Sequence, residues 1–300
     1  MEQIWAAPCS VWCALMQTEN SRELYQMTTT NDVFSSNQNM SQPESGSIQV
    51  FCSVIEDLLQ EHRPSRMPFF ENLAALPFSI ASDPLLLSQI HLIYQSAMHA
   101  TRAAVYNLPH LDSPALRQRK LQILIDDDGL PGGDTHHYQL TRAFLRIGAK
   151  PLLPEEGFGD LDDLCHHLDG ETLHFVKLAG ELYSRSLGPW CAIEVMSVDW
   201  MRALAEAFSV HFPLFIDEPY FSECFSQQVE ERHAAEALEI TQMVLSARPI
   251  LLEETLRDAK RMAEALDGVW RDLDRLVDDA CRRADAGCSL ESTKHVPVHW

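Results

Sequence analysis

Glu230 and His233 stand three positions apart in the segment Val229-Glu230-Glu231-Arg232-His233. Residues at this spacing share one face of a helix, and Glu-x-x-His is how helical di-iron carboxylate proteins present two ligands to a metal. If the segment is one continuous helix, Glu223 and Ser226 lie on the same stripe. Because Glu-x-x-His also arises by chance in Glu-rich helices, a metal site needs further ligands elsewhere in the chain.

Two other places offer such ligands. Asp127 belongs to the acidic helix end Asp126-Asp127-Asp128-Gly129, and a short glycine loop separates it from His136-His137 at the start of the next helix. The helix dipole disfavours an acidic C-terminus and a charged histidine at an N-terminus, so the alternatives are a metal site and a solvated pair of helix ends. Glu194 lies among apolar residues, where a carboxylate is either exposed or, if buried, paired or metal-bound.

The elements that must position these residues are helices. From Ile48 onward apolar residues recur at three- and four-residue spacing, and no segment alternates with period two. Ser82-Asp83-Pro84 and Ser113-Pro114 mark helix starts, and Asp134 or Thr135 is the expected cap of a third helix. Helices are expected from 48, over 84–108, 114–128, 138–147, 172–186, 189–208 and 217–247, and from Pro249 to 285.

These segments predict an all-α fold, a single bundle of about seven or eight helices over residues 48–285. The polar composition up to residue 47 predicts a loosely ordered leader over residues 1–47. Residues 286–300 are expected to form a flexible tail. The 300-residue chain is long enough for a sizeable core, with 46% hydrophobic residues.

Charge and cysteine content restrict the function classes. A formal net charge of −21 argues against binding to nucleic acid and to anionic membrane surfaces. No apolar run approaches the roughly 20 residues of a membrane span. The eight cysteines form no Cys-x-x-Cys pair, and with no secretory signal they indicate reduced thiols in a cytoplasmic protein.

The order of these ligands carries a resemblance. From about residue 62 to 245, the chain resembles the haem-oxygenase-like di-iron oxidases. The resemblance lies in the order of the motifs: Asp127, a glycine-bearing loop, His137 followed by Tyr138-Gln139-Leu140-Thr141-Arg142-Ala143-Phe144-Leu145, then Glu194, then Glu230 and His233. The resemblance implies a haem-oxygenase-like bundle of about seven helices with non-haem iron in its middle. Its ligands, by position, would be Asp127, His137, Glu194, Glu230 and His233.

One position departs from the family pattern. The late motif of the family is His-x-x-x-Asp/Glu-x-x-His, and its first histidine would stand at Ser226. Glu223, one turn earlier on the same stripe, is our candidate for the missing metal ligand, with Gln227 and Cys224 less well placed by helical phase. If no residue replaces this histidine, the chain would bind one iron fewer than the family, or none.

The resemblance implies two Fe(II) ions, O2 as co-substrate and oxidation of a small-molecule substrate by N-oxygenation, oxidative C–C cleavage or desaturation, in specialised metabolism. No flavin or nicotinamide fingerprint is present, so electrons would come from an external donor. Two other functions stay open. One is a metal-free thiaminase-like or PQQ-synthase-like enzyme, or a binding protein, on the same scaffold, which Ser226 favours. The other is a non-catalytic partner subunit that uses the long last helix. A homodimer is left open.

Overall fold

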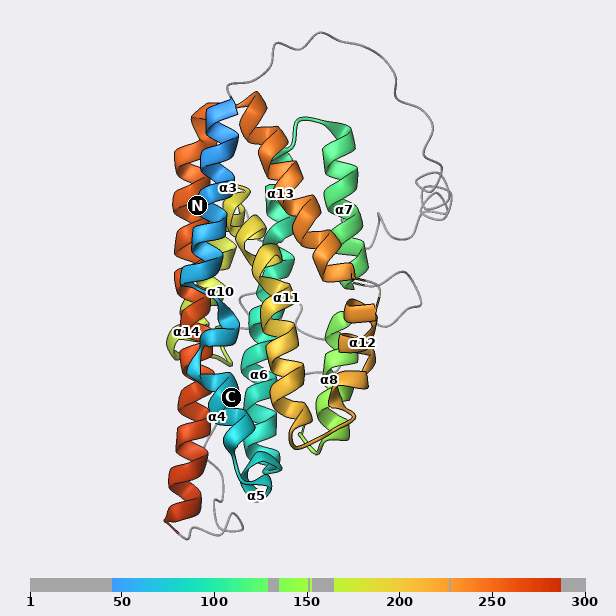
Figure 1. Ribbon diagram of the computed structural model, residues 1–300, viewed down its shortest axis with the longest axis vertical. Helices are drawn as coiled ribbons and strands as arrows, with labels where there is room; N and C mark the ends of the chain where they lie inside the picture. Colours follow the sequence, from blue (N-terminus) through green and yellow to red (C-terminus); the bar gives the residue numbers. More distant parts are fainter. Residues whose placement is uncertain (1–44, 129–134, 151, 153–164, 227, 287–300) are drawn as a thin grey trace.

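The computed structural model describes residues 45–128, 135–150, 152, 165–226 and 228–286. All regular structure in these residues is helical, and Figure 1 shows the long helices gathered into one elongated bundle. The expectation of an all-α fold is therefore confirmed. Within the described ranges, every helix is too short or too polar to cross a lipid bilayer.

Two long helices organise the core. The first, α14 (Leu252–Asp285), packs against α10 (Gly170–Tyr183), α11 (Gly188–Ser209) and α6 (Pro84–Thr101), and the second, α11, also packs along α13 (Val229–Ala247). A Cβ atom added to Gly188 would lie 1.9 Å from the carbonyl oxygen of Thr255. The lack of a side chain at position 188 therefore allows the backbones of α11 and α14 to approach this closely.

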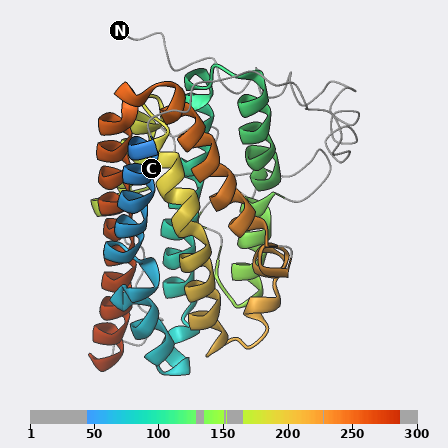
Figure 2. The same ribbon diagram turned by 45° about the horizontal axis from the view of Figure 1, so that its top comes forward.

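The other side of the bundle carries shorter helices. They are α7 (Pro114–Asp128), α8 (His136–Arg146) and α12 (Pro219–Ser226). In Figures 1 and 2, α7 lies beside α13, and α8 and α12 lie below them, away from α14. Thr135 caps α8 as expected, since its hydroxyl accepts a hydrogen bond from the backbone N–H of Tyr138.

Among the described residues, the first helix begins at Ser45, three residues inside the expected leader. The remaining elements are α3 (Ser45–Glu61), η1 (Pro64–Arg66), α4 (Pro68–Ala75), α5 (Phe78–Ala81), η2 (Arg102–His110), η3 (Phe215–Asp217) and η4 (Pro249–Leu251). The helix expected over 84–108 is α-helical only to Thr101 and continues as the 3-10 helix η2. The rest of the leader, 1–44, and the tail from 287 lie outside the described residues.

The prediction of one helix over 217–247 was wrong. The α-helix α12 ends at Ser226, and α13 begins at Val229. Between them, Gln228 has a φ of 52°, in the left-handed region. A single left-handed residue turns the chain and ends the helical phase relation, so the stripe that joined Glu223 and Ser226 to Glu230 does not exist.

We predict that this turn reverses the usual preference for alanine over glycine at position 228. In a helix interior, glycine destabilises by about 1 kcal/mol relative to alanine. At a left-handed position, alanine is the strained residue, by about 1 kcal/mol. The free energy of unfolding, measured with denaturant, should therefore be higher for Gln228→Gly than for Gln228→Ala. A more stable alanine variant would contradict the left-handed conformation at position 228.

Candidate metal centre

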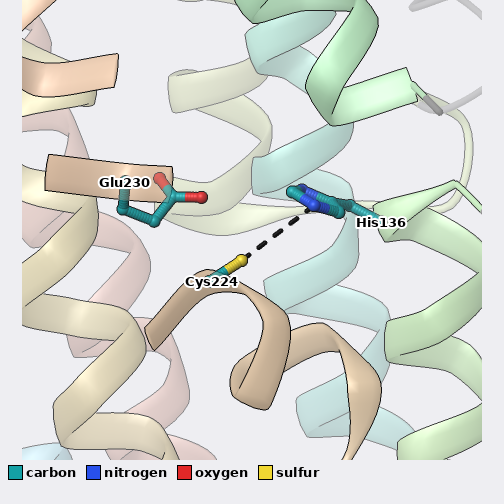
Figure 3. A group of neighbouring side chains, drawn as sticks. All are labelled: His136, Cys224 and Glu230. Carbon is teal, nitrogen blue, oxygen red and sulfur yellow. Dashed lines mark hydrogen bonds between the residues drawn. The ribbon is translucent and has the colours of Figure 1, made fainter. Parts of the chain in front are cut away.

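Four helix ends converge on the side of the bundle away from α14. The C-terminal turns of α7 and α12 bring Asp127 and Cys224, and the N-terminal turns of α8 and α13 bring His136 and Glu230. Figure 3 shows the side chains of His136, Cys224 and Glu230 pointing toward one another. Each side chain thus comes from the last or first turn of its helix, so the cluster forms where α7 and α12 end and α8 and α13 begin.

The first group of potential ligands is His136, Cys224 and Glu230. One atom from each lies within 4.8 Å of the other two. The thiol of Cys224 and Nε2 of His136 are 4.0 Å apart, and both Cys224 and Glu230 are buried. Imidazole, thiolate and carboxylate are all metal ligands in proteins.

The second group is Asp127, Glu230 and His233, again with ligand atoms within 4.8 Å of one another. Nδ1 of His233 lies 3.7 Å from Oδ1 of Asp127, which is too long for a hydrogen bond. The same Asp127 oxygen lies 3.6 Å from Nδ1 of His136. The two groups share Glu230, so its carboxylate stands where it could bridge two ions.

His233 has a partner that fixes its ring. Its Nε2 faces Oδ2 of Asp126 at 3.3 Å, and Asp126 in turn accepts a hydrogen bond of 2.7 Å from Nε2 of Gln122. Metal-binding histidines commonly donate their second ring N–H to a carboxylate, which sets the tautomer and orients the ring. Asp126 supplies such a carboxylate and leaves Nδ1 directed toward Asp127.

The electrostatics of the cluster favour a bound cation. Burial opposes ionisation of His233, but the hydrogen bond to Asp126 and the charges of Asp127, Glu194 and Glu230 raise its pKa to about 9. Burial lowers the pKa of His136 despite the nearby Glu230, and raises the pKa of the Cys224 thiol, as does the charge of Glu230. A divalent ion would relieve the repulsion among the carboxylates and stabilise the thiolate.

The structure brings some predicted ligands together and separates others. Asp127, Glu230 and His233 meet in the second group. His137 belongs to neither group, and its neighbour His136 stands in the first. Glu223 is exposed, and its Oε2 accepts a hydrogen bond of 3.0 Å from Nε2 of Gln139.

Glu194 is buried next to the two groups without belonging to either. Its Oε1 accepts a hydrogen bond of 2.7 Å from Nε1 of Trp190. Burial raises the pKa of Glu194, and the neighbouring charges of His233, Glu230 and Lys120 also act on it. Glu194 is therefore an electrostatic neighbour of the cluster.

Two members of the cluster were missed by sequence reasoning. His136 was within reach, because Thr135 as the cap places position 136 in the first turn of α8, facing the end of α7. Cys224 was set aside on helical phase, and the break at Gln228 removes that argument. Searches with this chain match no protein-family model, no curated protein and no solved structure.

The raised pKa of His233 predicts how the stability of the metal-free protein depends on pH. Its folded pKa, about 9, exceeds the unfolded value of about 6.5. The stabilisation is therefore complete below pH 6.5 and is lost as the pH rises through about 9. Asp126→Asn should reduce this loss by about 1 kcal/mol, measured as free energies of unfolding at pH 6 and 9.5 after chelation.

The control is Asp57→Asn, at an exposed position of α3, which should keep the wild-type pH dependence. Equal losses in the Asp126 variant and the wild type would show that this carboxylate does not hold the proton on His233.

Proposed function

We propose that this protein is an iron-dependent oxidoreductase that binds two metal ions on either side of Glu230 and oxidises a small molecule with O2. The observation that carries the proposal is the sharing of Glu230 by two groups of ligand atoms, each within 4.8 Å. A bridging glutamate between sets of carboxylates and histidines is the arrangement of di-iron helical bundles. The sequence resemblance to haem-oxygenase-like di-iron oxidases supports the same assignment.

The residues fit such ions. Nδ1 of His233 is buried and has no hydrogen-bond partner among the described residues. Metal–ligand bonds of about 2.1 Å place two ligands of one ion roughly 3 to 4 Å apart, and this nitrogen lies 3.7 Å from Asp127. An ion between them would use a nitrogen that is otherwise left without a partner.

The chain's own groups would have distinct tasks. Asp127, Glu230 and His233 would hold one ion, and His136, Cys224 and Glu230 the other, while Asp126 orients the ring of His233. Ferrous iron in such a site would supply the activation of O2. The site is closed by core side chains such as Tyr220 and Phe221 on one side and stays open to water on the side of Asp127, whose side chain is 37% exposed. Electrons would come from an external donor.

A second candidate function follows from Cys224. A thiolate with histidine and glutamate is a ligand set that zinc accepts readily. In that case the first group would hold a single zinc ion, and the protein would be a zinc protein with no use for O2.

Metal loading separates these functions. Titration of the chelated protein with Fe(II) without oxygen should end near two ions per chain, and admission of O2 with ascorbate should then start O2 uptake. Glu230→Gln should weaken both sites, whereas Cys224→Ser and His233→Ala should each remove one ion. Because Glu223 is exposed and outside both groups, Glu223→Gln is the matched control and should bind as the wild type does.

If the wild type binds no iron, and adding Fe(II) leaves its melting temperature unchanged, the proposal is contradicted. One tightly bound zinc ion and no O2 uptake would favour the zinc protein.

A further inference from the structure

An apolar patch is exposed at one end of the bundle. Phe78 on α5, and Val210 and Leu214 just after α11, are 59%, 62% and 75% exposed. Phe212, between the last two in sequence, is half-buried, and its ring packs against that of Phe78 with the centroids 5.8 Å apart. Large apolar side chains gathered on a protein surface commonly mark a contact site. The end patch is defined here as Phe78, Val210, Phe212 and Leu214.

The long helix α14 ends beside this patch. The ring of Phe70 on α4 lies 5.1 Å from that of Trp270 on α14, and Nδ2 of Asn72 donates a hydrogen bond of 2.8 Å to Oδ1 of Asp274. The two helices therefore run side by side in the same direction. The next helix, α5, also packs against α14, and Figure 1 shows it beside the lower end of α14. The chain that follows α14 thus starts close to the end patch.

Residues 287–300 have the sequence of a segment that could cover an apolar patch. Val296, Val298 and Trp300 stand at every second position, so an extended chain directs all three side chains to one face. Pro297 favours an extended conformation of the residue before it. Fourteen extended residues reach roughly 45 Å, which exceeds two helix diameters of about 10 Å each. The segment is therefore long enough to cross from α14 over α5 to the end of α11.

Charge also favours this segment as the occupant. Residues 292–300 include Lys294 and no acidic residue, although the whole chain has a net charge of −21. Glu206 and Asp217, which flank residues 210–214 in sequence, are exposed acidic residues. They attract a basic segment and repel an acidic one such as 153–164, which has five acidic and no basic residues.

We propose that residues 292–300 fold back onto the end patch and cover it. The side chains that make the contact on the segment are Val296, Val298 and Trp300. A second copy of the chain is a poorer occupant, because two chains of net charge −21 repel each other. The tethered segment, by contrast, meets the patch at an effective concentration on the order of millimolar. This inference is independent of the proposed metal centre.

The test places a photo-crosslinking residue in the patch of the full-length chain. Leu214→p-benzoylphenylalanine is irradiated, and the products are separated on a denaturing gel and digested with trypsin. Mass spectrometry of the monomer band should show position 214 joined to residues 295–300. The matched control is Ile250→p-benzoylphenylalanine, at an 89% exposed position of η4, which should give no crosslink to residues 295–300.

A second substitution tests whether apolar contact holds the segment. Val298→Asp, added to the crosslinking variant, should lower the yield at least about fivefold, because an ionised carboxylate is strongly disfavoured in an apolar contact. Ser289→Asp adds the same charge outside residues 292–300 and should leave the yield unchanged. Both substitutions lie beyond the end of α14, so the helices of the bundle should form in each variant.

The products identify any other occupant. A crosslink from position 214 to residues 1–44 or 153–164, or a crosslinked dimer on the gel, would overturn the inference, as would the absence of any crosslink. An undiminished yield in Val298→Asp would overturn it as well. Each of these results leaves iron binding untested, so this inference and the proposed function fail separately.

Discussion

The structure depends on how a helical core accommodates buried negative charge. Glu194 and Glu230 are buried, and the partly exposed Asp127 lies beside Glu230. Buried carboxylates require cations or hydrogen-bond donors as partners. Among the described residues, the groups near them that can carry a positive charge include His233, His136 and the buried Lys120. The remaining negative charge is what a divalent ion would neutralise, so the acidity of the cluster and its proposed function have one physical origin.

Helix ends, rather than helix faces, set the geometry of the cluster. The end of α7 and the start of α8 bring Asp127 to His136, and the break at Gln228 brings Cys224 to Glu230. Had α12 and α13 formed one helix, residues 224 and 230 would lie six positions apart, about 120° from one another around the axis. The left-handed residue is thus what lets the Cys224 thiol join the carboxylate of Glu230.

Much of this could be predicted from periodicity and capping. The all-α fold and the cap at Thr135 follow from local residue preferences, and Glu230 and His233 share a face because they lie within one helix. The assignment of Glu223 depended on helical phase carried across residues 227 and 228, where no local signal marks a left-handed glutamine. The burial of Lys120 could not be predicted from the sequence, because it depends on which helix packs over the side chain.

If the proposed function is right, two ions flank the carboxylate of Glu230. Anomalous diffraction at the iron absorption edge, from crystals of the Fe(II)-loaded protein grown without oxygen, tests it most directly. We expect two peaks, one contacting His136 and Cys224 and one contacting Asp127 and His233, with Glu230 between them. Absence of a peak at Glu230, with its carboxylate bonded only to protein groups, would contradict it.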